Sequence, residues 1–227
     1  MQLENEKTLN YLKRIRRRHG WFSVLHVIGL RCVNKFFDLR IFNVFVRHKV
    51  KISAHNNAEI FNIKFLNATE IEKYFGAGFN DITVNETHGL MSSQVSCLCV
   101  FDKKTEQIAA YSWYTNKAIS TGVHDFDITF AQKYIYTLKV YTAPKYRGQQ
   151  LHAWQMQYAL EQYHKQGFWG IVGFTYSDNF ESIKSNQKMG STTVGYFWVF
   201  RFFGHSFFFK TGQVSDYEIN LQRNVHA

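Results

Sequence analysis

The chain is poor in proline, cysteine and long apolar runs. It has one proline and three cysteines among 227 residues, which argues against proline-rich linkers and ligand motifs. Cys32, Cys97 and Cys99 are odd in number, and no second Cys or His pair stands at zinc spacing, so reduced thiols and no metal are expected. The uncharged run from Trp21 to Leu30 is far shorter than the roughly twenty residues that span a bilayer, so no transmembrane helix is expected.

Aromatic residues and positive charge are abundant instead. Phe, Tyr and Trp make up 18% of the chain, which suits a sizeable core in one domain plus an appendage. The net charge is +10, and residues 1–51 hold twelve Lys and Arg against three acids. The basicity is therefore a property of the N-terminal segment.

That segment, residues 1–55, is predicted to form two basic amphipathic helices ahead of a domain spanning 56–227. Apolar residues recur there at helical spacing on both sides of Gly20: Leu9, Leu12, Ile15, Trp21, Val24, Leu25 and Ile28. Such a helical pair suits an anionic membrane surface, or it packs on its own domain with a solvated basic edge. Nucleic acid is disfavoured because no recognition motif is present. Glu4 and Glu6 argue against a signal peptide.

The stretch with the most specific pattern is a predicted strand, turn and helix start. Residues 134–142 are rich in β-branched and aromatic side chains, Pro144 breaks the strand, and helical spacing begins at Leu151 and lasts until Gly167. The turn contains Arg147 and Gly148. Backbone N–H groups at such a helix start can hold a pyrophosphate, and the arginine adds charge.

A second strand and helix follow directly. Residues 168–175 read as a strand, and residues 179–190 as a short helix closed by Gly190. With these two segments in place the chain resembles the GNAT superfamily of acyl-CoA-dependent N-acyltransferases. The resemblance implies a mixed α/β fold with a mostly antiparallel central sheet flanked by helices, here preceded by the basic helical segment.

The resemblance also implies a site for acetyl-CoA or another acyl-CoA as cosubstrate. The residues that match the family's cofactor positions are Tyr141, Thr142, Arg147, Gly148, Gln149, Gln150, Leu151, Asn179 and Ser182. Two positions depart from the family. Gln150 stands where Gly or Ala is preferred, and Asn186 stands where a tyrosine often acts as acid on the leaving thiolate.

The remaining elements are predicted from pattern alone. Strands are expected at 59–66, 95–101 and 107–115, a capped helix start at 69–73, and mostly loop from 76 to 89. Residues 192–209 are expected to form a hairpin with its turn at Gly204 and His205 and with both faces covered. Tyr196, Trp198 and Phe200 are alternatives for the wall of an acceptor or acyl pocket.

Candidate acid and base residues lie outside the strand at 134–142, which has no carboxylate. His124, Asp125 and Asp127 are the first choice for the base, since a carboxylate can orient an imidazole that titrates near neutrality. His88 with Glu86, His152 and Glu181 rank below them, and an ordinary polar loop is the alternative. Tyr176 is the candidate acid.

The function expected from these residues is acyl transfer from acyl-CoA to an amine. An amino sugar or envelope precursor at the cytoplasmic membrane face is one acceptor class, and a soluble small amine is the other. A catalytically inactive GNAT-like module that docks on membrane or nucleic acid is the hypothesis from another class. A cytoplasmic location is expected, with peripheral attachment to the inner membrane face as a variant.

Overall fold

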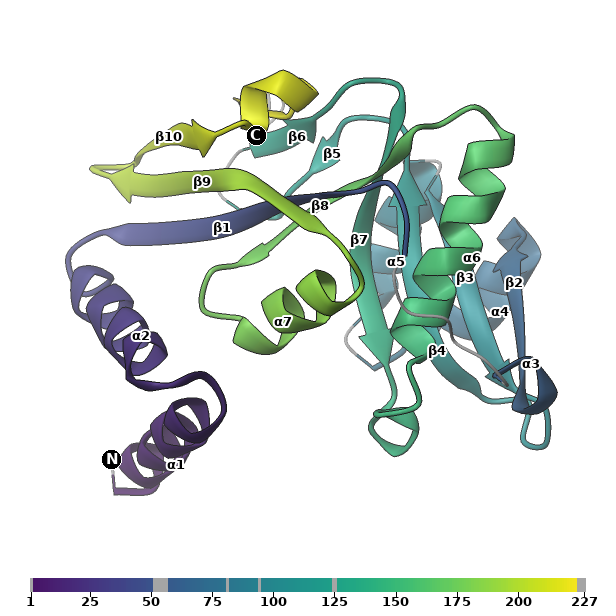
Figure 1. Cartoon of the computed structure of the whole chain (residues 1–227), viewed down its shortest axis with the longest axis horizontal. Helices are drawn as coiled ribbons and strands as arrows, with labels where there is room; N and C mark the ends of the chain where they lie inside the picture. The colour runs from purple at the N-terminus through teal and green to yellow at the C-terminus, as the bar shows by residue number, and fades with distance from the viewer. Residues whose placement is uncertain (1, 51–56, 81, 94, 124–125, 224–227) are drawn as a thin grey trace.

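The computed structural model describes residues 2–50, 57–80, 82–93, 95–123 and 126–223, with side chains from residue 8 onward. Strands of the main sheet are β1 (Asp38–Arg47), β2 (Phe61–Leu66), β3 (Ser96–Asp102), β4 (Ile108–Thr115), β7 (Tyr134–Thr142), β8 (Gly170–Tyr176), β9 (Thr192–Phe202) and β10 (His205–Gly212). They are ordered β10-β9-β1-β8-β7-β4-β3-β2 (Figure 1). A small sheet, ordered β11-β6-β5, combines β5 (Ile119–Ser120), β6 (Phe126–Thr129) and β11 (Asn220–Arg223).

The centre of the main sheet splits between β7 and β8. These two strands are parallel, whereas the other neighbouring pairs are antiparallel. They pair only over residues 134–136 and 170–172, after which β7 stays with β4 and β8 stays with β1. The sheet therefore opens into a wedge at the carboxyl ends of β7 and β8.

Helices cover both faces of the β2–β4 part of the sheet. Residues of β3 alternate between the two sides, as a strand period of two requires. Cys97 and Cys99 pack with α4 (Ala68–Phe75) and α5 (Val84–Ser92), and Leu98 packs with α6 (Leu151–Lys165). The expectation that both cysteines share one buried face is confirmed. The mixed, mostly antiparallel sheet flanked by helices matches the architecture that the sequence predicted.

The remaining short elements connect these layers. They are α3 (Asn57–Ile60), η1 (Pro144–Tyr146), α7 (Phe180–Lys188) and η2 (Val214–Tyr217). The predicted strands at 95–101, 107–115, 134–142 and 168–175 and the helices after them are confirmed within one or two residues. The stretch 76–89 is a correction, because α5 begins at Val84. Thr83 and Glu86 form a capping box there, a start signal that the loop prediction overlooked.

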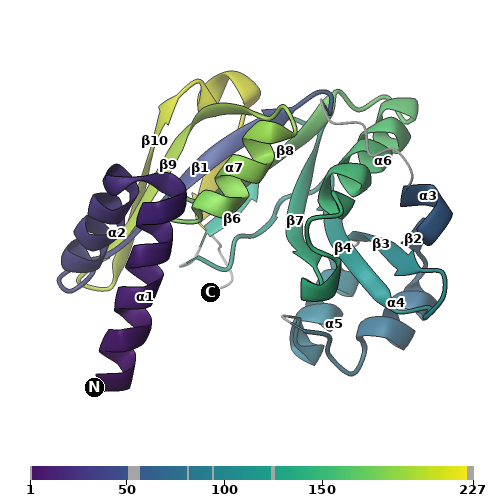
Figure 2. The same cartoon turned by 60° about the horizontal axis from the view of Figure 1, so that its bottom comes forward.

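Two helices begin the chain, as predicted. They are α1 (Gln2–His19) and α2 (Trp21–Val33). Ile15, Val24 and Val27 form a small buried cluster with the ring of Phe180 at the start of α7. Figure 1 and Figure 2 both show α7 between this helical pair and α6. Within the described residues, no helix is long and apolar enough to cross a bilayer.

The N-terminal segment also supplies a strand that the sequence analysis did not predict. Strand β1 lies between β8 and β9 and pairs with both. Residues 41–47 are buried on both faces, so they are mostly apolar, with Asn43 and Arg47 as the exceptions, and do not alternate as a half-exposed strand would. Residues 38–47 of the expected 1–55 segment thus belong to the sheet, and α1 and α2 stand outside it.

The hairpin of β9 and β10 corrects the expectation of two covered faces. Its turn contains Phe203 and Gly204, both with positive φ, close to the predicted position. One face of β9 is buried through Val194, Phe197 and Val199. The other face is open, and β10 is the edge strand of the sheet. The apolar composition therefore reflects one core face and one exposed aromatic face.

Gly195 allows β9 to approach β10 and the start of η2 closely. Its φ is +151°, and an added Cβ would lie 1.8 Å from the carbonyl oxygen of Thr211 and 2.8 Å from Val214. We expect Gly195→Ala to lower the free energy of unfolding by about 3 kcal/mol or more, since both backbone strain and overlap are introduced. Urea unfolding measures this. Gly29→Ala is the matched control, because nothing lies within 4 Å of its added Cβ; equal stability of the two variants would contradict the packing argument.

Candidate active site

A cleft of about 1800 Å³ opens where β7 and β8 diverge. It is lined by residues 137–142 of β7, by the turn before α6 with the first turn of that helix, by the end of β8 and by α7. Parts of α5 and β5 and the last turn of α1 complete the lining. The cleft therefore joins the two segments on which the sequence resemblance rests.

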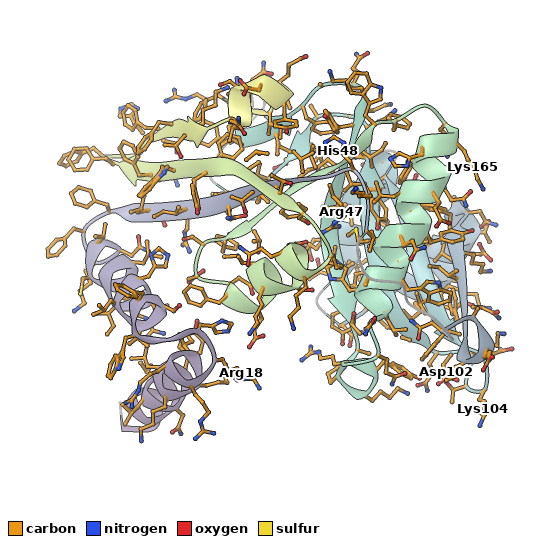
Figure 3. The ribbon with its side chains drawn as sticks, viewed as in Figure 1. Arg18, Arg47, His48, Asp102, Lys104 and Lys165 are labelled. Atoms are coloured by element: carbon orange, nitrogen blue, oxygen red, sulfur yellow. The ribbon has the colours of Figure 1, made fainter. Side chains whose placement is uncertain are left out.

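The turn between β7 and α6 is anchored on its inner side. Tyr146 is buried, its hydroxyl donates to Asp102 at 2.8 Å, and its ring meets that of Phe61 edge-on at 5.6 Å. The hydrogen bond from Tyr146 is the main cause of the lowered pKa of Asp102, which lies at the end of β3 in the lower right of Figure 3. Arg147 Nε donates to the carbonyl oxygen of Thr142 at 3.2 Å. These contacts fix the turn while its outer backbone stays accessible.

The outer side of the turn fits a polyanion. Gly148 has φ +83° with open space around an added Cβ, and no side chain caps the start of α6. The first N–H groups of a helix lack intrahelical acceptors and carry the positive end of its dipole. Gln150 adopts the left-handed conformation at φ 57°, at a cost on the order of 1 kcal/mol for a non-glycine residue. The departure at Gln150 therefore leaves the shape of the turn intact.

Most of the cofactor residues implied by the resemblance line the cleft. Those that do are Tyr141, Thr142, Arg147, Gly148, Gln150, Leu151 and Ser182. Gln149 is exposed, and its carbonyl oxygen accepts a hydrogen bond from Asn57 at 3.3 Å. Asn179 caps α7 by accepting from the N–H of Ser182 at 3.2 Å. These last two residues shape the backbone around the cleft.

A buried arginine lies behind the cleft wall. Arg47, at the end of β1, is fully buried, and Figure 3 shows it in the interior beside α7. Its Nη2 donates to Asn186 Oδ1 at 2.7 Å and to Ser191 Oγ at 2.5 Å. Its Nε and Nη1 have no hydrogen-bond partner among the described residues. Burial lowers the pKa of Arg47 to about 10, so the side chain remains a cation at neutral pH without a carboxylate bonded to it.

This arrangement determines how Asn186 presents its amide. A guanidinium only donates hydrogen bonds, so the amide must turn its oxygen toward Arg47 and keep its NH₂ group for another acceptor. Asn186 is itself buried and lines the cleft. The position where the family often has a tyrosine thus carries an amide donor polarised by a buried positive charge.

His152 lies beside this network and is held neutral. Its Nδ1 is 3.4 Å from Ser185 Oγ, and its Nε2 is shielded from solvent and has no hydrogen-bond partner within the described segments. Burial, assisted by the charge of Arg47, lowers the pKa of His152 to about 3. A group with so low a pKa is a weak base at neutral pH. His152, considered a base candidate from sequence, is therefore a neutral wall residue of the cleft.

Strand β7 carries a bulge at the cleft. Lys139 has φ 47°, and the pairing with β4 shifts register between Tyr111 and Trp113. A bulge leaves backbone groups of the extra residue unpaired. Tyr141 and Thr142 remain paired with β4, so the free backbone lies near Lys139 and Val140, just before these two residues that the resemblance assigns to the cofactor. Both residues line the cleft.

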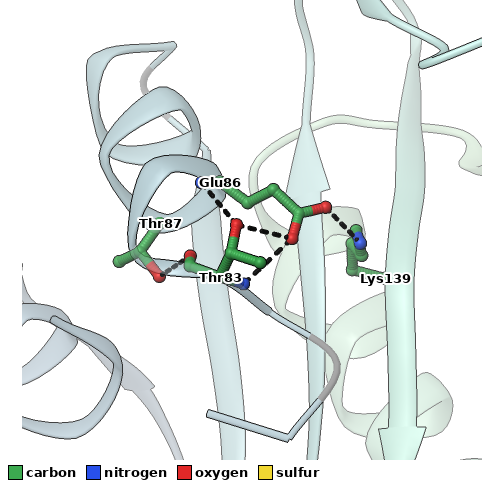
Figure 4. A network of polar contacts seen from close by, with 4 residues as sticks. All are labelled: Thr83, Glu86, Thr87 and Lys139. Carbon is green, nitrogen blue, oxygen red and sulfur yellow. Dashed lines mark hydrogen bonds and ion pairs between the residues drawn. The ribbon is translucent and has the colours of Figure 1, made fainter. Parts of the chain in front are cut away.

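Glu86 ties the bulge to α5. Lys139 Nζ donates to Glu86 Oε1 at 2.7 Å, and the other carboxylate oxygen accepts from the N–H and hydroxyl of Thr83 (Figure 4). Lys139, followed by Thr83, lowers the pKa of Glu86 to about 2. Glu86 is thereby committed to a structural contact, which makes it a poor proton acceptor. Its sequence partner His88 is oriented toward Glu72 instead, with Nε2 3.9 Å from Oε2.

The other acid and base candidates differ in whether they line the cleft. His124 and Asp125 lie outside the described residues. Asp127, on β6, lines the cleft and is partly buried. Tyr176, at the end of β8, also lines the cleft, with its ring 4.7 Å from that of Phe42. Glu181 binds Arg18 of α1 at 2.7 Å, and this contact is the main cause of its lowered pKa.

Sequence reasoning did not identify Arg47, Lys139, Arg18 or His19 as residues of this region. One signal was available for Arg47, because it is a charge that ends the apolar run 41–46. The others depend on a bulge and on helix packing, neither of which has a local signature. Among the described residues, no group of three or more His, Cys, Asp or Glu is arranged to hold a metal ion.

The fold resembles several solved structures at low sequence identity. A Drosophila protein matches with a TM-score of 0.50 and 11% identity, covering 80% of this chain and 58% of its own. A GCN5-related N-acetyltransferase-like protein from Streptococcus suis matches at 0.48 and 11%, covering 81% and 68%. A GNAT family N-acetyltransferase from Escherichia coli, solved in complex with CoA, matches at 0.36 and 16%, covering 50% and 62%.

No family model and no curated protein matches the sequence. The match spans less than two thirds of the length of the Drosophila chain. At these identities the comparisons speak to the fold alone. The mostly antiparallel sheet flanked by helices and the strand, turn and helix that lead into α6 agree with the architecture that the resemblance implied. The chain has the mixed, mostly antiparallel α/β architecture that the sequence resemblance implied.

Proposed function

We propose that the protein is an acyl-CoA-dependent N-acyltransferase. The observation that carries the proposal is the uncapped start of α6 at the Gly148 turn, which opens into a cleft between two diverging strands. The pyrophosphate would bind at this helix start together with Arg147. The pantetheine arm would then run along the bulged part of β7 toward Asn186. Acetyl-CoA is the default donor.

The reaction requires a base, an oxyanion donor and a partner for the leaving sulfur. The amine nitrogen attacks the thioester carbonyl carbon, the C–N bond forms, and the electrons of the breaking C–S bond leave on sulfur. Asp127, alone or with His124 and Asp125, takes the amine proton. A backbone N–H at the bulge near Lys139 and Val140 stabilises the oxyanion.

Asn186 serves the leaving thiolate in this scheme. Its NH₂ group donates a hydrogen bond to the sulfur, and the buried charge of Arg47 strengthens that bond. The thiolate is thereby stabilised by hydrogen bonding, and its proton can come later from solvent. Tyr176 is retained as an alternative acid, since it lies on the opposite strand of the wedge.

For the acceptor we propose an amine on an amino sugar or envelope precursor at the cytoplasmic membrane face. The basic N-terminal helices support this location, because the last turn of α1 lines the cleft through Arg18 and His19. A soluble small amine is the alternative acceptor. A non-catalytic docking module is the second candidate function, and Gln150 and Asn186 favour it because both depart from the family pattern.

The first test is calorimetric titration of the full-length protein with acetyl-CoA. Saturable one-to-one binding is expected for the wild type. Arg147→Ala is expected to weaken binding about tenfold or more, because a charge-assisted hydrogen bond contributes roughly 1.5–3 kcal/mol. Lys165→Ala is the control, as an exposed lysine at the other end of α6.

Three outcomes separate the candidates. Binding followed by thiol release with a member of an amine panel supports the transferase. Binding without turnover for any amine supports the docking module. Absence of heat with acetyl-CoA and with longer acyl-CoAs would contradict the proposed cofactor site.

A further inference from the structure

An exposed phenylalanine cluster lies at one end of the molecule. It consists of Phe36 and Phe37 in the connection from α2 to β1 and of Phe202 and Phe203 at the turn of the β9–β10 hairpin. Their exposed fractions are 81%, 42%, 44% and 86%. The rings of Phe37 and Phe202 are 5.5 Å apart, and those of Phe202 and Phe203 are 4.3 Å apart. We call these four residues the phenylalanine tip.

The apolar surface continues from the tip along α2. At 100° per residue, positions 22, 25, 29 and 33 share one side of α2, and Phe36 follows in the turn after the helix. Phe22 is 89% exposed and Leu25 61% exposed. The buried residues Val24 and Val27 lie on the other side, against α7. In Figure 1 and Figure 2 the end of α2 and the hairpin turn lie next to one another.

The charges around this surface have one sign. Asp38 is the sole acidic residue between residues 9 and 50, and it is bound to Arg40 at 2.8 Å. Residues 192–214 contain no acid. Lys35 is exposed next to Phe36 in the chain, Arg31 is exposed in the last turn of α2, and Arg16 lies over the ring of the exposed Trp21 at 4.4 Å. Exposed aromatic side chains are thus bordered by cations with few carboxylates to neutralise them.

We propose that the phenylalanine tip and the outer side of α2 form a surface that inserts into an anionic lipid bilayer. Large exposed apolar patches on a folded chain mark interaction surfaces. A second copy of this chain would bring like charges together, which disfavours self-association. An anionic bilayer complements both the aromatic side chains and the basic border. The inference extends the membrane-side location proposed above, but it does not depend on acyl transfer.

The test is sedimentation of the full-length protein with vesicles. Wild type is expected to bind vesicles of phosphatidylglycerol and phosphatidylcholine, and to bind pure phosphatidylcholine weakly. Phe36→Ser combined with Phe203→Ser should weaken binding roughly tenfold or more, because two exposed apolar side chains no longer enter the bilayer. Lys35→Glu combined with Arg31→Glu should lower binding and its salt dependence.

Trp169→Ser is the matched control, since it removes a 58% exposed aromatic far from the tip in sequence. It is expected to bind vesicles as wild type does. Thermal melts and acetyl-CoA calorimetry on each variant separate loss of docking from misfolding and from failure of the cofactor site. The proposal is overturned if wild type ignores anionic vesicles, if the double phenylalanine variant binds unchanged, or if that variant only converts a dimer to a monomer in light scattering.

Discussion

An Asn186→Asp variant is expected to keep or gain stability while losing activity about 100-fold or more. The new carboxylate would pair with Arg47, which has two donor nitrogens that find no partner in the part of the chain that the structure describes, so the buried charge would be compensated. The same carboxylate has no N–H to offer the leaving sulfur and repels a thiolate. Removal of one such donor typically costs 10²–10³-fold, that is roughly 3–4 kcal/mol, in the transition state.

The thiol of bound CoA gives a readout that needs no acceptor. Ultraviolet absorbance of the thiolate, followed against pH, should show a lower thiol pKa in the wild-type complex than in the Asn186→Asp complex. Arg47→Met should raise that pKa as well, because the buried charge that polarises the Asn186 amide is removed.

Gln187→Glu is the control for the added charge. Gln187 is the next residue of α7, but it is exposed and does not line the cleft. Its variant should leave both the thiol pKa and turnover unchanged. Equal thiol pKa values in wild type, Asn186→Asp and Arg47→Met would show that this pair does not act on the sulfur, even if acetyl-CoA binds normally.

Acid is expected to destabilise the fold through His152. Its pKa falls from 6.5 to about 3 on folding, so the unfolded chain binds a proton that the folded chain excludes. The contribution of the neutral His152 to the free energy of unfolding is fully present above pH 6.5 and is lost as the pH falls toward 3. Allowing for the partial exposure of the side chain, we expect a loss of at least about 2 kcal/mol. Urea unfolding at several pH values measures it.

His152→Leu should remove most of this pH dependence. His164→Leu is the control on the same helix, because His164 is exposed, and it should retain the wild-type slope. The range between pH 6.5 and 4.5 is the informative one. Glu86, with a folded pKa of about 2 and an unfolded value of 4.5, adds its own acid sensitivity only below that range. A wild type equally stable across the informative range would contradict the buried, neutral His152.

Local signals explain how much of the site could be predicted from sequence. Pro144, Gly148 and the spacing after Leu151 define a strand, a turn and a helix within some twenty residues, and that part of the cleft was predicted. Asn186 was recognised as a departure, but its role depends on Arg47, a residue 139 positions away. The location of Arg47 follows from β1 lying between β8 and β9, and no local pattern encodes a pairing over such a separation.

Exposure was equally hard to predict for the aromatic hairpin. Alternation in residues 192–209 is masked because both faces carry apolar side chains. Composition alone therefore favoured a strand covered on two sides, although β10 is an edge strand. Phe36 and Phe37 have no local pattern that marks them as exposed, and the contact of Phe37 with Phe202 of the hairpin is a tertiary one. The phenylalanine tip thus became visible only in the folded chain.

The position of β1 also governs how this protein can fold during synthesis. Its partners β8 and β9 lie more than a hundred residues later in the chain, so the strand has no edge to join until the ribosome has made most of the protein. Until then the apolar run 41–46 and the basic helices before it stay without their native neighbours. Long-range pairings of this kind form slowly and leave apolar segments open to aggregation. We expect chains that stop before β9 to need chaperones or to be degraded, and ribosome-bound chains of increasing length to become protease-resistant only once β9 has emerged.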